Sequence, residues 1–259
     1  MNERVVSAEW LADRLDDVRV VDVRDGWEFG GIGHVPGAVN VPFESFRAEE
    51  HGLAEAGRLP GAAVFSSRLG DVGITHDDHL VAYDDTHGVF AARFLVTAEL
   101  YGHDPDRLHL LNGDFSSWQL EHETSAEQTT VSETTYPAAY DEDGPLVGTD
   151  AVRAALDDET VVVDVRASWE YDDGHLPGAV RLDWRELVDD DTRGLLSERE
   201  LRTRLETRGI VPDRPVCLYC NTARRISHTY VVLCALGYDD VAFYEGSLTE
   251  WLAAGGELV

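Results

Sequence analysis

The sequence contains no lysine, so all 21 of its basic residues are arginine, and they are outnumbered by 50 aspartate and glutamate residues. The formal net charge of −29 makes the surface repel nucleic-acid phosphates and anionic lipid. Only three cysteines are present, too few for the disulfide framework of a secreted domain. No apolar run approaches the ~20 residues of a membrane span, and the first residues lack the basic and apolar regions typical of a signal peptide. We therefore expect a cytoplasmic protein that binds neither nucleic acid nor membrane.

The acidic, lysine-free composition resembles that of proteins from salt-accumulating microbes. At molar salt the Debye length is about 3 Å, so repulsion between surface carboxylates is screened. At low salt the same charges destabilise the compact state. We expect a halophilic protein whose stability increases with salt; the alternative is an acidic protein from an ordinary cell.

One long pattern occurs twice, which indicates two homologous domains. In both copies the letters VDVR are followed by WEF or WEY and then by GHVPGAV or GHLPGAV. These motifs occupy residues 21–24, 27–29 and 33–39 in the first copy and 163–166, 169–171 and 174–180 in the second. A chain of 259 residues accommodates two domains of roughly 130 residues. We predict a first domain at 1–122, a linker at 123–146 and a second domain at 147–259.

Short apolar runs alternate with helical patterns in each copy. Runs at 18–23, 80–83 and 108–111 correspond to runs at 161–165, 216–219 and 241–244. Their near-continuous valine and leucine content is typical of strands buried on both faces of a parallel sheet. Ser197 and Glu200 form a capping-box pattern at the start of one helix. The sequence therefore predicts two α/β/α domains, each of three layers with a mainly parallel central sheet.

Cys220 follows the predicted strand 216–219 and precedes Arg224 and Arg225. In open α/β sheets, ligands bind beyond the carboxyl ends of the strands. Loop amides, a helix N-terminus and neighbouring guanidiniums all stabilise a thiolate. We predict an exposed, nucleophilic Cys220, with both arginines holding an anionic group of the substrate. The alternative is a buried structural cysteine beside two solvated arginines.

The repeated motifs, together with YCNTARRISHTYVVL at 219–233 and YEGSLTEW at 244–251, resemble the rhodanese superfamily of sulfurtransferases. The chain is similar throughout to the tandem-domain thiosulfate and 3-mercaptopyruvate sulfurtransferases, in which only the second domain keeps the cysteine. Asp84 stands in the place of Cys220 in the first copy. The resemblance implies that Cys220 forms a persulfide and that residues 220–225 form the active-site loop.

The resemblance also implies substrate-binding residues in this loop. The residues predicted on this basis are Asn221, Thr222, Ala223, Arg224 and Arg225. Arg225 corresponds to the loop-closing arginine of bacterial thiosulfate sulfurtransferases. The chain departs from the family where Asn221 replaces an arginine, Ala223 replaces a glycine, and Glu170 stands at the substrate-binding arginine of vertebrate members.

The implied reaction moves the sulfane sulfur of thiosulfate to a thiol or cyanide through a Cys220 persulfide, without a metal or organic cofactor. Asp84, Arg93 and Arg166 are further candidates for the lining of the cleft. Two alternatives stay open: 3-mercaptopyruvate as the donor, and a sulfur-carrier or interaction module that receives sulfur from a protein partner. A cysteine-dependent phosphatase is excluded by spacing, because these enzymes place arginine six positions after the cysteine, where this chain has Ile226.

Other candidates have structural explanations. Cys217 and Cys234 are expected in the core, and His34 and His175, each flanked by glycine and Pro-Gly, are expected to fix turns. The Asp and Arg of the two VDVR motifs are expected to form buried ion pairs.

Overall fold

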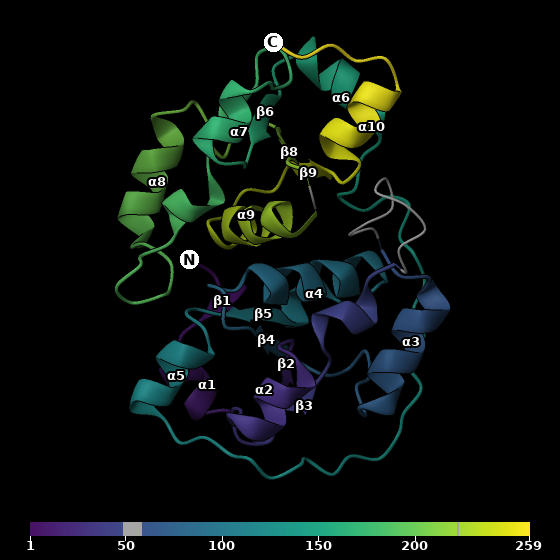
Figure 1. Ribbon diagram of the computed structural model, residues 1–259, viewed down its shortest axis with the longest axis vertical. Helices are drawn as coiled ribbons and strands as arrows, with labels where there is room; N and C mark the ends of the chain where they lie inside the picture. Colours follow the sequence, from purple (N-terminus) through teal and green to yellow (C-terminus); the bar gives the residue numbers. More distant parts are fainter. Residues whose placement is uncertain (49–58, 222) are drawn as a thin grey trace.

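The computed structural model describes residues 1–48, 59–221 and 223–259, which form two α/β halves (Figure 1). The first half contains a parallel sheet with the strand order β1-β5-β4-β2-β3. Its strands are β1 (Val5–Val6), β2 (Arg19–Asp22), β3 (Val39–Asn40), β4 (Leu80–Tyr83) and β5 (Leu108–Leu111). The second half contains a parallel sheet with the order β7-β6-β8-β9. Its strands are β6 (Val161–Asp164), β7 (Val180–Arg181), β8 (Val216–Tyr219) and β9 (Val241–Tyr244). The predicted parallel α/β architecture is confirmed.

Helices cover both faces of each sheet (Figure 1). In the first half they are α1 (Ala8–Ala12), α2 (Gly26–Gly31), η1 (Phe43–Phe46), α3 (Ala62–Asp71), α4 (Val89–Leu100), η2 (Pro105–Arg107) and α5 (Phe115–Glu121). In the second they are α6 (Thr149–Leu156), α7 (Ser168–Asp172), η3 (Trp184–Leu187), α8 (Glu198–Glu206), α9 (Ala223–Ala235) and α10 (Ser247–Ala253). The predicted capping box of α8 is present, since Ser197 and Glu200 bond each other's backbone and side chain. Within the described residues, no helix combines the length and apolar character that crossing a bilayer requires.

The two halves pack through α4 and α9, which lie side by side between the sheets (Figure 1). Both helices contribute to one continuous apolar core, with Phe94 and Leu95 from α4 and Val231 and Val232 from α9. Each of these helices begins just after the central strand of its own sheet. The interface therefore brings the carboxyl ends of β4 and β8, and the residues that follow them, toward a common region.

Between residues 123 and 146 the chain forms neither a helix nor a strand and follows the outside of the first half (Figure 1). Ser125 pairs with His34, and the amide of Thr134 donates to the carbonyl of Gly70 at 3.0 Å. The ring of Tyr136 is buried against Phe65. This segment is therefore packed on the first half along much of its length, although its composition resembles that of a loose connection.

The structure corrects the expected extent of the active-site loop. We expected a loop over residues 220–225, but α9 begins at Ala223, so Arg224 and Arg225 lie in its first turn. Alanine and arginine favour helix, whereas the glycine found in related loops would not. The two guanidiniums are therefore presented by a helix.

Candidate active site

Cys220 lies directly after β8 and is not in a disulfide. Its side chain is 0% exposed, which contradicts the prediction of an exposed sulfur. Cys220 and Ile226 of α9 belong to the same apolar core, and Arg225 interacts with the sulfur. The amide of Cys220 donates to Oγ of Ser247 at 3.2 Å. Cys220 is thus held between the first turns of α9 and α10.

Arg225 is bound in fork geometry by Glu170 of α7. Nη1 donates to Oε2 at 2.6 Å and Nη2 donates to Oε1 at 2.9 Å. The hydrogen bonds from Arg225 lower the pKa of Glu170 below its usual value, although burial opposes this shift. Burial lowers the pKa of Arg225, but the interactions with Glu170 and Cys220 outweigh this effect, so the pKa is raised overall. Both groups are therefore charged at neutral pH, and Arg225 connects the carboxylate to the sulfur.

Asn221 continues this network away from the sulfur. Its Nδ2 donates to Oε1 of Glu170 at 2.9 Å, and its Oδ1 accepts from Nη1 of Arg166 at 3.4 Å. Arg166 is buried and forms an ion pair with Asp164 at 2.6 Å. Among the described residues of the loop, Arg166 bonds to Asn221, which is consistent with a supporting role beneath the loop.

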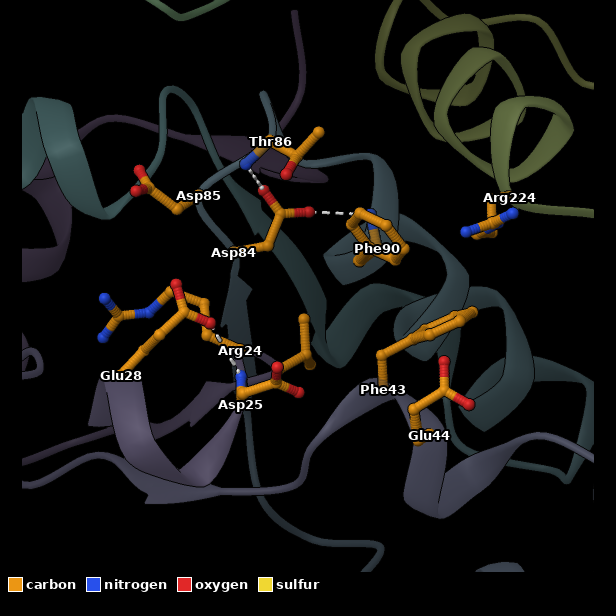
Figure 2. Close-up of a pocket in the computed structure, with 11 residues that line it drawn as sticks. Arg24, Asp25, Glu28, Phe43, Glu44, Asp84, Asp85, Thr86, Phe90 and Arg224 are labelled. Carbon is orange, nitrogen blue, oxygen red and sulfur yellow. Dashed lines mark hydrogen bonds between the residues drawn. The ribbon is translucent and has the colours of Figure 1, made fainter. Parts of the chain in front are cut away.

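Arg224 points the other way, toward the first half (Figure 2). Its guanidinium carbon lies 5.6 Å from the ring centre of Phe43 and 5.3 Å from that of Phe90. These rings and Arg224 line a cavity of about 370 Å³ between the halves, together with Asp84 and other polar residues (Figure 2). Burial and the nearby positive charge of Arg47 lower the pKa of Arg224. In the described part of the chain, no carboxylate lies within salt-bridge distance of Arg224.

Asp84 occupies the corresponding place in the first half and lines the same cavity (Figure 2). Its carboxylate is buried and accepts hydrogen bonds from the backbone amides of Thr86, Gly88, Phe90 and Ala91 at 2.7 to 3.0 Å. Burial nevertheless raises its pKa. The amides that follow β4 therefore surround an anion supplied by the chain itself, and this half has no thiol at the position.

The other residues predicted for the site are placed as follows. Arg93, expected near the cleft, forms an ion pair with Glu245 that joins the halves, and it does not belong to the described lining of the cavity at Arg224. Thr222 lies outside the described residues, and so does the side chain of Ala223. In the described residues, no group of three or more histidine, cysteine, aspartate or glutamate side chains is arranged to hold a metal.

The histidines of the repeated motif fix turns, as predicted. His34 bonds through its ring nitrogens to the carbonyls of Phe29 at 2.9 Å and Glu127 at 3.1 Å. His175 bonds to the carbonyl of Tyr171 at 3.0 Å and stacks on its ring. Neither histidine lies in the set of groups around Cys220, so both are structural.

The remaining cysteines have different environments. Cys217 is buried in the core, as expected, and burial raises its pKa to about 12. Cys234 is only partly buried and lies beside Arg4 in the wall of another cavity; burial raises its pKa to about 11. Neither thiol is ionised at neutral pH, which leaves Cys220 as the candidate nucleophile.

Two site residues escaped the sequence analysis in their observed roles. Glu170 was noted only as a departure from the family, and its pairing with Arg225 joins residues far apart in the sequence. Ser247 has a left-handed backbone with φ of 49°, a conformation that a serine rarely adopts. This backbone places its hydroxyl between the amide of Cys220 and the carbonyl of Tyr244, and the local sequence carries no signal for it.

Comparisons with known proteins agree with this architecture. The rhodanese-like domain matches residues 7–121 and again residues 149–254. The chain is 32% identical to a putative thiosulfate sulfurtransferase, SseA, of Mycobacterium bovis, over 96% of this chain and 88% of that protein. It is 30% identical to a putative thiosulfate sulfurtransferase of Haloferax volcanii, over 95% of this chain and 92% of that protein.

Among solved structures, the chain is similar to the 3-mercaptopyruvate sulfurtransferase SseA of Escherichia coli. The TM-score is 0.79 and the sequence identity 25%, over 96% of this chain and 100% of the other. The relatives are thus named for two different sulfur donors. Because the domain matches both halves and the relatives align along nearly the whole length, the chain belongs to the rhodanese family of sulfurtransferases and carries two copies of its domain.

Proposed function

We propose that the chain is a thiosulfate sulfurtransferase that carries the sulfane sulfur as a persulfide on Cys220 and passes it to a thiol or to cyanide. The observation that carries this proposal is the position of Cys220 at the carboxyl end of β8, directly before the N-terminus of α9 and beside the interacting guanidinium of Arg225. A guanidinium and a helix N-terminus both stabilise a thiolate, which is the reactive form of cysteine.

The reaction proceeds in two displacements. The Cys220 thiolate attacks the sulfane sulfur, the sulfur–sulfur bond of thiosulfate breaks, and sulfite leaves with the bonding electron pair. An acceptor thiolate or cyanide then attacks the outer sulfur of the persulfide, which releases the Cys220 thiolate and yields an acceptor persulfide or thiocyanate. Neither step changes the total oxidation state or requires a further reactant.

The cationic side chains bind the donor. Arg224 lines the cavity between the halves and has no carboxylate partner in the described residues, so it is suited to the oxygens of a sulfonate. Since Cys220 is 0% exposed, the side chains that cover it have to move before the donor reaches the sulfur. Arg225 interacts with the sulfur and is one of the groups next to it.

A second candidate donor is 3-mercaptopyruvate, and one observation favours it. Glu170 pairs with Arg225, and Asn221 is neutral, so Arg224 is the one arginine of the described loop without a carboxylate at salt-bridge distance. One cation matches one carboxylate. The third possibility, a carrier of sulfur from a protein partner, shares the Cys220 persulfide but requires neither small donor.

The test is the formation of thiocyanate from cyanide with each donor in turn. Turnover with thiosulfate supports the proposal, and turnover with 3-mercaptopyruvate alone supports the second candidate. A protein that turns over with neither donor, yet accepts sulfur from a protein persulfide, is a carrier. Cys220→Ser is the control in each case, because it keeps the size and polarity of the side chain and removes the nucleophile.

A further inference from the structure

Glu170 binds the guanidinium nearest to the reactive sulfur. We propose that Glu170 is a specificity-determining residue: its carboxylate occupies and neutralises Arg225, and thereby disfavours dianionic sulfur donors relative to monoanionic ones. This inference rests on the proposed sulfur transfer at Cys220, and it holds whichever donor the native protein prefers.

The first argument is geometric. Both terminal nitrogens of Arg225 donate to Glu170, at 2.6 and 2.9 Å, so the fork that binds a sulfonate or carboxylate in two bonds is already filled. Glu170 is itself held firmly, since it also accepts from Nδ2 of Asn221 at 2.9 Å and from the amide of Ala167 at 3.2 Å. Its side chain is only 9% exposed. A donor anion therefore meets a fixed carboxylate at Arg225.

The second argument is the charge balance around the loop. Asp164 compensates Arg166 and Glu170 compensates Arg225, whereas Arg224 keeps its charge in the described part of the site. Thiosulfate carries two negative charges at neutral pH, and 3-mercaptopyruvate with its thiol protonated carries one. Arg224 attracts the first negative charge, whereas in the described part of the site a second one at Arg225 meets the Glu170 carboxylate already paired there. Such repulsion inside a partly buried site is weakly screened by salt.

The third argument comes from the internal repeat. Glu28 stands at the same place in the first half, and its Oε2 accepts from the amide of Asp25 at 3.1 Å, just as Glu170 accepts from Ala167. Both glutamates thus cap their own short helix. In the described residues only Glu170 also pairs with an arginine. The role of Glu170 in capping α7 is therefore separable from its role at Arg225.

Glu170→Gln tests the inference, because glutamine keeps an oxygen for the cap and for one bond to Arg225 while it removes the charge. The values of kcat/KM for thiosulfate and for 3-mercaptopyruvate are measured with cyanide as acceptor. We expect the thiosulfate to 3-mercaptopyruvate ratio to rise about tenfold, mainly through a lower KM for thiosulfate. Asp172→Asn makes the same change of charge at an exposed position of the same helix and is expected to leave the ratio unchanged.

A second variant, expected to change the ratio in the opposite direction, keeps the inference testable if Glu170→Gln folds poorly. Asn221→Asp adds a negative charge beside Glu170 at an exposed position. The first half already has an aspartate, Asp85, at the equivalent place. We expect this variant to lower the thiosulfate to 3-mercaptopyruvate ratio. An unchanged ratio in folded Glu170→Gln, an equal shift in Asp172→Asn, or a raised ratio in Asn221→Asp overturns the inference. If mass spectrometry finds no sulfur on Cys220 of the native protein with either donor, the proposed function itself fails. Sulfur on Cys220 with an unchanged ratio rejects only the role of Glu170.

Discussion

Asp84 and Cys220 follow equivalent central strands in the two halves, and both are buried at the start of the helices that join those halves. In the first half the amides of this turn bind the carboxylate of Asp84. In the second half the equivalent turn follows Cys220 and leads into α9, which begins at Ala223. The pair shows equivalent turns with different side chains, a fixed carboxylate in one copy and the proposed nucleophile in the other.

The first prediction concerns the stability that Asp84 provides. Asp84→Asn keeps one oxygen but turns an amide group toward backbone donors, so at least one buried N–H loses its acceptor. We expect a loss of about 1–3 kcal/mol in the free energy of unfolding, measured by urea denaturation. The persulfide on Cys220 should still form. A variant as stable as the native protein would show that these hydrogen bonds contribute little.

The second prediction concerns Arg225. Arg225→Ala removes the group that bonds the sulfur and leaves Glu170 without its partner, so we expect kcat/KM for thiosulfate to fall about a hundredfold, with KM raised and kcat lowered together. Arg225→Lys should recover only part of the activity, because an ammonium cannot make the forked contact with Glu170. Steady-state kinetics of both variants provide the measurement. Native kinetics in Arg225→Ala would remove this residue from the site.

The third prediction concerns acid stability and His228 of α9. His228 is buried against Trp184, and neither ring nitrogen meets hydrogen-bond geometry with a partner in the described residues. Burial lowers its pKa to about 4, and the neighbouring charge of His87 acts in the same direction, while the backbone of His87 offsets part of the effect.

Between the unfolded pKa of about 6.5 and this folded value, the unfolded chain binds the extra proton. The contribution of His228 to stability is therefore complete above pH 6.5 and is lost as the pH falls toward 4. His228→Leu should flatten the decrease of unfolding free energy across this interval. Urea denaturation of both proteins at several pH values measures this decrease. The difference between the two proteins at pH 8, above this interval, gives the effect of the changed packing alone. Parallel curves for both proteins would contradict the assignment.

The fourth prediction concerns salt. With a net charge of −29, repulsion between surface carboxylates opposes folding in dilute buffer and is screened at molar ionic strength. We expect the melting temperature to rise between dilute buffer and molar KCl. The rise should occur mainly at the lower concentrations, where the Debye length changes most. A melting temperature that is indifferent to KCl would exclude this explanation of the composition.

Local patterns predicted much of the fold, and tertiary contacts explain what they missed. The strand ending at Tyr219 could be predicted because its apolar residues are contiguous, which places Cys220 at the carboxyl end of a central strand. The strands β1, β3 and β7 have two residues each and are too short to form a pattern. The burial of Cys220 depends on how α9 packs, which no spacing in the sequence reveals.

The pairing partners of the site arginines were likewise beyond local reasoning. Glu170 and Arg225 are 55 positions apart, and Arg93 and Glu245 are 152 positions apart. The type of each residue suggested a role in binding an anion, but the carboxylate that meets it is set by the fold. For this reason the sequence predicted the identity of the loop arginines but not their different surroundings.

The most direct test of the account is the intact mass of the protein after exposure to thiosulfate and removal of the excess donor. The account predicts one additional sulfur atom on the native chain, its loss on addition of cyanide, and no additional sulfur on Cys220→Ser. An unchanged mass for the native protein, or an equal gain in Cys220→Ser, would contradict the claim that Cys220 carries the transferred sulfur.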